Sequence, residues 1–271
     1  MSINSISPSF TFAACRDLKR FIGRATAAVA ANEVALRHTA EYIRKQSEPD
    51  PWSVLAQEFG IRVNGIHTDE VKSISAKLHI VSIYAGFDRF VKALHREWFE
   101  LSGNEWQKYD SDGPFDELIR NAPCNEKTFF QVVDEPLRIG IDHYRMVRNA
   151  VAHPSEDNEQ STDSYYDVNI EKLHELGAMY KMTTAPHSRK LIDFHDAKLL
   201  AQISIDATKQ ISIAFDPGDE LLAACVPLKL RSRIDGGSAR KHNRISCYLR
   251  TKYGLSLERA EKIVHEIEMA H

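Results

Sequence analysis

The stretch TDEVKSISAKLHIVSIYAGFDRFVKALHREWFEL, residues 68–101, decides the fold class of this chain. Its apolar residues recur mostly at steps of three or four, which places them along one face of a helix. Thr68 can cap the N-terminus, and Asp69 and Glu70 fall in the first turn, where carboxylates meet the positive end of the helix dipole. Gly103 follows the last apolar position and ends the helix. The expected core-facing residues are Ile74, Leu78, Val81, Ala85, Phe87, Val91, Leu94, Trp98 and Leu101.

Helical patterns continue on both sides of this stretch. A first helix is expected from about Thr11 to Lys45, because residues 47–51, SEPDP, stop it with proline. Residues 154–163, PSEDNEQSTD, contain no apolar residue and are expected to form an exposed loop. Ile203–Phe215 also shows some two-residue alternation, so helix is favoured there and strand stays open. Further helices are expected near 115–120, 136–153, 168–181, 196–215, 246–253 and 256–270, the last capped by Ser256. The fold class is all-α, with long antiparallel helices.

Composition and short sequence patterns argue against several classes of protein. Hydrophobic residues make up 43% of the 271 residues, enough for a core, yet no run approaches 18 apolar residues, which argues against a membrane span. The N-terminus lacks the basic and apolar regions of a secretory signal, so a cytoplasmic location is expected. The sequence contains no CxxC, HExxH or HxxxH pattern, and no metal or cofactor is expected. The isolated cysteines are Cys15, Cys124, Cys225 and Cys247.

The charge distribution suggests two parts, residues 1–216 and a basic helical extension, 217–271. The extension carries ten Lys/Arg against seven Asp/Glu. Its cations attract phosphates in one interpretation and form a solvated face in the other, and charge alone does not separate the two. Arg240, Lys241 and Arg244 are the candidate RNA-binding residues. Within 229–252, Asp235 is the single acid beside eight cations: Lys229, Arg231, Arg233, Arg240, Lys241, Arg244, Arg250 and Lys252.

The pattern Arg-x4-His occurs three times, at Arg62…His67, Arg138…His143 and Arg148…His153. The first falls in an expected loop. The second falls inside a helix, where a five-residue step leaves the side chains roughly 140° apart, so they do not converge. Only the third has a context that lets the two side chains meet.

That context is Pro154, which follows His153. Proline disfavours helical backbone in the residue before it, so the helix should end near His153 and free the imidazole from helical spacing. A histidine acts as an acid or base near neutral pH, and an arginine offers a planar, charged fork to a phosphate. Asn149 supplies donors and an acceptor that can position substrate or neighbours. The structural alternative is that Arg148 and His153 merely complement the negative helix end.

The stretch YRMVRNAVAHP, residues 144–154, resembles the signature of the HEPN superfamily, an arginine followed by a polar residue and, a few positions on, a histidine. In that family the motif lies at a helix end in a helical bundle. Residues 84–90, YAGFDRF, loosely resemble the family's acidic position, with Asp88 as the acid. The resemblance covers about residues 68–155 and extends over 1–216, but not over the basic extension.

The resemblance implies a metal-independent endoribonuclease that leaves a cyclic phosphate. Arg148 would contact the scissile phosphate, His153 would transfer protons, Asn149 would orient them and Asp88 would orient Arg148. Arg145, one turn before Arg148, extends the phosphate contact or is a surface charge.

The resemblance also implies a homodimer paired through the motif, and a toxin or antiviral defence effector held in check by an antitoxin or regulatory protein. One alternative is a non-catalytic HEPN module that binds RNA, nucleotide or a partner protein. A second alternative is a helical interaction protein unrelated to RNA.

Overall fold

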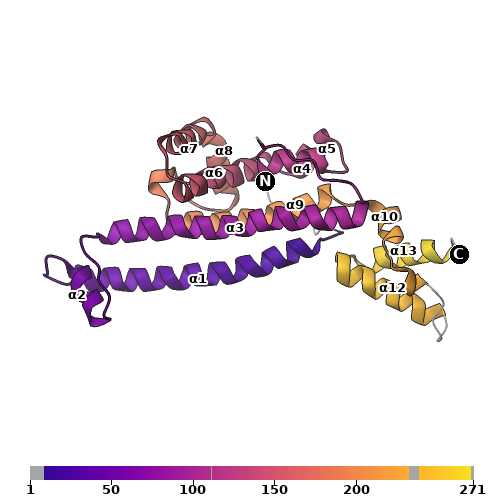
Figure 1. Cartoon of the computed structure of the whole chain (residues 1–271), viewed down its shortest axis with the longest axis horizontal. Coiled ribbons are helices and arrows are strands. Elements are labelled where there is room, and N and C mark those ends of the chain that lie inside the picture. Colours follow the sequence, from indigo (N-terminus) through magenta and orange to yellow (C-terminus); the bar gives the residue numbers. More distant parts are fainter. Residues whose placement is uncertain (1–8, 111, 232–237, 270–271) are drawn as a thin grey trace. The chain divides into compact units, whose positions relative to one another are not determined.

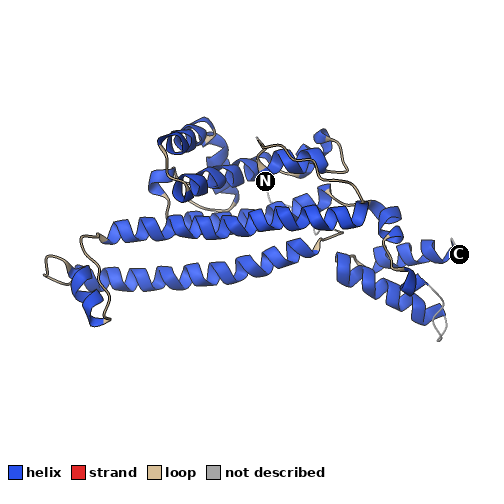
Figure 2. Cartoon of the chain, viewed as in Figure 1, coloured by secondary structure: helices blue, strands red, loops and turns tan. Residues whose placement is uncertain are grey.

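A computed structural model describes residues 9–110, 112–231 and 238–269. All regular structure in these ranges is helical, and Figure 2 shows the helices joined by loops. The helices are α1 (Ala13–Arg44), α2 (Pro51–Glu58), α3 (Thr68–Ser102), α4 (Pro114–Asn121), α5 (Glu126–Val132), α6 (Glu135–Ala152), α7 (Glu156–Val168), α8 (Ile170–Met179), the 3-10 turn η1 (Arg189–Leu191), α9 (Phe194–Ala214), α10 (Gly218–Ala224), α11 (Leu228–Arg231), α12 (Ser238–Tyr253) and α13 (Leu257–Met269). The all-α prediction is confirmed, and the segment 203–215 is helix.

The chain forms two compact units that interleave in sequence. Unit 1 comprises Met1–Arg20, Gly86–Arg138 and Ser204–His271, and unit 2 comprises Phe21–Ala85 and Ile139–Ile203. The basic extension 217–271 therefore belongs to the same compact unit as Met1–Arg20, Gly86–Arg138 and residues 204–216. Arg233 and Asp235 lie outside the described residues.

In unit 1, the first turn of α1 lacks an acidic residue of its own, and α3 supplies one. The carboxylate of Glu97 accepts hydrogen bonds from the backbone N–H groups of Ala13 and Ala14, at 2.8 and 2.7 Å. These bonds satisfy two of the donors that every helix N-terminus leaves unpaired. The aromatic core of the unit includes the edge-to-face pair of Trp98 and Phe215.

In unit 2, α1 and α3 run in opposite directions, with α2 near the turn between them (Figure 1). Asn32 on α1 reaches across to Ser75 on α3, with its amide nitrogen 2.6 Å from the serine oxygen. The buried side chains of the unit include Val29, Ile80, Ile83, Tyr144, Val147, Leu173, Leu176 and Leu200.

The expected core face of α3 is wrong in its first half. Ile74 and Leu78 are 45% and 57% exposed, whereas Ile80 and Ile83 are fully buried. Ile74 and Ile83 are nine residues apart, which is about half a turn around the helix. This half of α3 is apolar on two faces, and periodicity does not say which face packs.

The loop expected over residues 154–163 is also wrong, because α7 begins at Glu156. The hydroxyl of Ser155 accepts a hydrogen bond from the backbone N–H of Asn158, and acidic residues fill the first turn. Both features stabilise a helix start without any apolar residue. Thr162 is the buried residue of this helix, so α7 contributes only one small side chain to the interior.

Candidate functional site

The last turn of α6 builds the predicted site. The helix ends at Ala152, one residue before His153, as the proline at 154 predicts. The backbone N–H of His153 still donates to the carbonyl oxygen of Asn149, at 2.8 Å. His153 is exposed, and its imidazole makes no hydrogen bond to any residue that the structure describes. The helix end therefore presents a free imidazole to solvent.

Arg148, one turn earlier, is half-buried and has no acidic partner within the described residues. Its Nη1 donates to the side-chain oxygen of the next residue, Asn149, at 2.8 Å. Its Nε is buried and lacks a hydrogen-bond partner in the same part of the chain. A guanidinium carries five donors, and in Arg148 only Nη1 donates to another described residue. A partly desolvated cation without a counter-charge is costly, and a bound anion would relieve that cost.

Arg145 differs from Arg148 although it lies on the same helix one turn away. Its Nε donates to the carboxylate of Asp142 at 2.9 Å, within the same helix. Its charge is therefore already compensated locally. Arg145 is a weaker candidate for a phosphate contact than Arg148.

Asp88 lies on the part of α3 that belongs to unit 1. Its carboxylate pairs with Lys92 one turn later, at 2.8 Å, and is about half exposed. The motif residues Arg148, Asn149 and His153 belong to unit 2. The orienting role expected for Asp88 stays a prediction.

Sequence reasoning missed a buried polar cluster that joins α6, α9 and the segment before η1. The carboxylate of Asp196 is fully buried and accepts four hydrogen bonds. They come from the hydroxyl of Tyr144 (2.9 Å), the backbone N–H and the Nδ1 of His187 (2.9 and 2.7 Å), and the backbone N–H of Asp193 (2.9 Å). Asp193 in turn accepts from the backbone N–H of His195, so both acids cap α9. The two acids, three residues apart before an apolar run, were the available signal.

Burial alone would raise the pKa of Asp196, but the hydrogen bonds from His187 and the backbone amides bring it below its usual range. The same side-chain hydrogen bond raises the pKa of His187 above its usual value. The pKa of nearby His143 is shifted in the opposite direction, because complete burial lowers it to about 4. Its Nε2 lies 2.9 Å from the carbonyl oxygen of His187. A carbonyl only accepts, so Nε2 of His143 carries a proton, and its buried Nδ1 has no partner among the described residues.

Within the described ranges, one group of side chains is close enough to share a metal ion. It consists of His187, Asp193 and Asp196, whose potential ligand atoms lie within 4.8 Å of one another. Both oxygens of Asp196 already accept hydrogen bonds, so metal binding would require that cluster to rearrange. The geometry fits a helix cap better than a preformed metal site.

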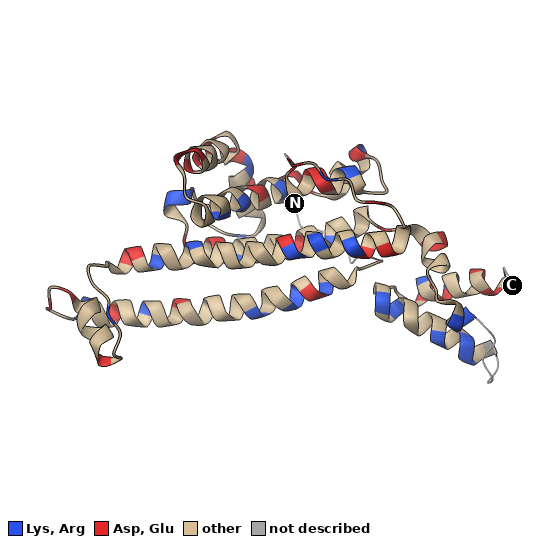
Figure 3. Ribbon diagram, viewed as in Figure 1, with Lys and Arg blue, Asp and Glu red and all other residues tan. Residues whose placement is uncertain are grey.

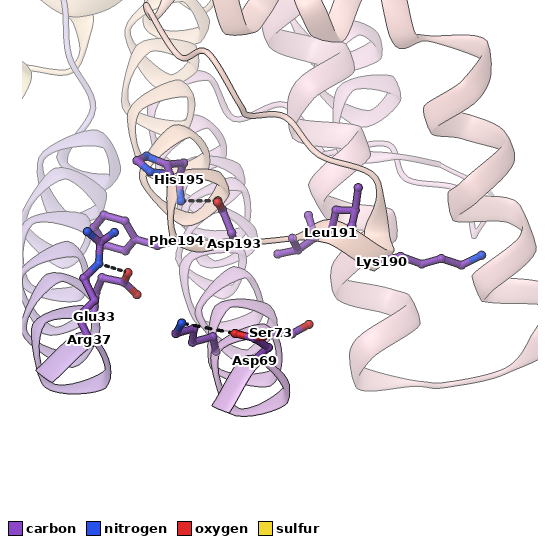
Figure 4. A pocket seen from close by; sticks show the side chains of 11 residues that line it. Glu33, Arg37, Asp69, Ser73, Lys190, Leu191, Asp193, Phe194 and His195 are labelled. Carbon is purple, nitrogen blue, oxygen red and sulfur yellow. Dashed lines mark hydrogen bonds and ion pairs between the residues drawn. The ribbon is translucent and has the colours of Figure 1, made fainter. Parts of the chain in front are cut away.

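Unit 2 contains a cavity of about 400 Å³ (Figure 4). Its walls come from α1, α3, η1 and the start of α9. Arg37 bonds to Glu33 at 2.7 Å and Lys72 to Asp69 at 3.5 Å, both on their own helices. Neither Arg148 nor His153 lines this cavity.

The candidate RNA-binding residues of the extension lie on α12 in unit 1, where cations follow one another along the helix (Figure 3). Arg240 and Arg244 are exposed and Lys241 is half-buried. None of the three pairs with an acid in the described part of the chain. Acidic residues gather instead on α13, where Lys262 lies 3.9 Å from Glu266, while Arg259 of the same helix pairs with Asp219 on α10 at 2.8 Å. Tyr253 is buried and Tyr248 is half-buried.

Among the described helices, none combines the length and the hydropathy that a membrane span requires. Comparison of the chain with known proteins found no matching family model, no matching curated protein and no matching solved structure.

Proposed function

We propose that this chain is a metal-independent endoribonuclease of the HEPN type, with its active site at the end of α6. The observation that carries the proposal is the half-buried guanidinium of Arg148, which has no acidic partner in the described residues and lies one turn from an exposed imidazole. A cation that lacks an internal counter-charge favours an anionic ligand. The free imidazole beside it supplies a group that transfers protons near neutral pH.

In the proposed reaction, the 2′-oxygen of RNA attacks the adjacent phosphorus and the bond from phosphorus to the 5′-oxygen breaks. The 2′-hydroxyl loses a proton and the departing 5′-oxygen gains one, which leaves a 2′,3′-cyclic phosphate and a 5′-hydroxyl. His153 takes part in this proton transfer, and Arg148 stabilises the charge that grows on the phosphate oxygens. Asn149 orients Arg148, a role supported by their 2.8 Å hydrogen bond.

The cations of α12 favour RNA binding as well. Arg240, Lys241 and Arg244 have no acidic partners in the described part of the chain, so they are available to phosphates. This surface equally supports the second candidate, a non-catalytic HEPN module that binds RNA, nucleotide or a partner protein. The same proposal includes the HEPN-like bundle itself and the pairing of two copies through the motif. It also includes a cytoplasmic role as toxin or antiviral effector and restraint by an antitoxin or regulatory protein.

The test is incubation of the purified chain with labelled single-stranded RNA and with tRNA in EDTA. Wild type should cleave, and His153→Ala should lose roughly 100- to 10,000-fold in rate, the usual contribution of a positioned acid or base. His174→Ala, which changes an exposed histidine on α8, is the matched control and should cleave like wild type. Circular dichroism checks that all three proteins fold.

Equal cleavage by wild type and His153→Ala would exclude the proposed site. RNA binding without cleavage by any of the three proteins would favour the non-catalytic module.

A further inference from the structure

The junction between α6 and α7 is only three residues long, and Asn158 holds it from the α7 side. The backbone N–H of Asn158 donates to the hydroxyl of Ser155 at 3.2 Å. Its side-chain amide nitrogen donates to the carbonyl oxygen of His153 at 2.7 Å. A single residue therefore ties both the start of α7 and the end of α6.

The carbonyl that Asn158 bonds would otherwise lack a partner within α6. The last carbonyl groups of a helix have no hydrogen-bond donor in the helix itself, and Pro154 has no N–H to offer. With Asn158 in place, both backbone hydrogen-bonding groups of His153 are fixed, the N–H by Asn149 at 2.8 Å and the oxygen by Asn158. The backbone of His153 is thus held while its imidazole stays exposed.

A second link keeps α7 on the last turns of α6. The buried hydroxyl of Thr162 lies 3.2 Å from the carbonyl oxygen of Met146 and 2.6 Å from that of Asn158. Met146 precedes Arg148 by two residues, so the contact falls beside the motif. Thr162 therefore links α7 to α6 one helical turn beyond Asn158.

We propose that Asn158 is the residue that positions His153 for proton transfer, an inference that rests on the proposed ribonuclease function. Proton transfer requires the imidazole to be within hydrogen-bond reach of the reacting oxygen, and small displacements are costly. Asn158 acts on the backbone of His153 and leaves Arg148 untouched. Its loss should lower the rate of the chemical step while RNA binding stays intact.

The test compares the full-length chain with Asn158→Ala and with Asn158→Asp, which keeps the shape of the side chain but removes its donor. Asn169→Ala is the matched control, because Asn169 makes the same kind of bond at the other end of α7, to the carbonyl oxygen of Tyr165 at 2.9 Å. Cleavage of labelled RNA in EDTA gives kcat and KM. Nitrogen-15 relaxation gives the order parameter of the His153 amide, independently of activity.

Both Asn158 variants should lower kcat by roughly 10- to 100-fold and leave KM within about twofold. They should also lower the order parameter of His153, and Asn169→Ala should change neither quantity. If wild type does not cleave RNA, the ribonuclease proposal fails, and the order parameter alone still decides whether Asn158 holds His153. An unchanged order parameter in both folded Asn158 variants, or an equal loss of kcat in Asn169→Ala, would overturn the inference.

Discussion

Two Arg-x4-His sequences ten residues apart lie along α6 and at its C-terminal end, and the two histidines have opposite environments. His143 is fully buried, bonded to the carbonyl of His187, and its pKa is lowered to about 4. His153 is exposed beyond the helix end. Arg138, the arginine of the first pair, stacks over the ring of Phe130, with 4.4 Å between the guanidinium carbon and the ring centroid.

The difference shows that residue type and spacing do not define a proton-transfer site. A buried, neutral imidazole is a component of the core, because charging it would require desolvating the cation. An exposed imidazole at a helix end, about one turn along the chain from an arginine without a counter-charge in the described residues, remains available to a ligand. Pro154 ends α6 just before His153, whereas His143 lies inside the helix on its buried face.

The largest expected effect is on the rate of RNA cleavage, and it should distinguish Arg148 from Arg138. Arg148→Ala should lower RNA cleavage by about 100- to 1,000-fold, the usual result of removing a donor that stabilises transition-state charge. Arg138→Ala, the matched change in the other pair, should alter cleavage by less than about threefold once folded protein is compared, because its contacts are structural. Cleavage rates in EDTA, with thermal unfolding of each variant, measure both effects.

Equal losses of cleavage in folded Arg148→Ala and Arg138→Ala would mean that the proposed site does not depend on the free guanidinium. Arg148→Lys sharpens the result, since it keeps the charge but not the planar fork.

The next effect concerns the pH dependence of stability. The pKa of His143 is lowered from 6.5 to about 4 in the folded chain, so its contribution is present above pH 6.5 and is lost as pH falls toward 4. At about 1.4 kcal/mol per pKa unit, that loss is on the order of 3 kcal/mol. His143→Gln, which keeps a side-chain donor, should lose less stability than wild type between pH 7.5 and 4.5 in urea denaturation.

His187→Gln is the matched variant, and it should change the pH dependence of stability in the opposite direction. The pKa of His187 is raised by its bond to Asp196, so its contribution is present below pH 6.5 and is lost as pH rises through the folded value. Relative to wild type, His187→Gln should therefore lose more stability as pH falls. Parallel pH profiles for wild type and His143→Gln would show that His143 does not resist protonation in the folded chain.

The smallest effect extends the comparison to exposed cations. Changing Arg240, Lys241 and Arg244 together to Gln should weaken RNA binding about tenfold at low salt and reduce the slope of log affinity against log salt by up to about 2. The catalytic rate at saturating RNA should be unchanged. Fluorescence anisotropy over a salt series measures the slope, and an unchanged slope would identify α12 as a solvated face.

Several elements followed directly from the sequence. The ends of α1 and α3 fall within two residues of the expected positions, and Ser256 accepts the backbone N–H of Arg259 at 3.2 Å, as a cap does. These features depend on residues close together in the chain, because proline, glycine and caps act within one turn. The end of α6 before His153 is of the same kind.

The sequence by itself determined the all-helical class, the long helices and the place where α6 stops. Tertiary structure alone decided which apolar face of α3 is buried. It likewise brought His187 and Tyr144 to Asp196, left Arg148 without a counter-charge in the described residues, and joined Asn158 to His153. Local propensities act over a few residues, whereas burial and hydrogen-bond partners depend on segments that meet only after folding.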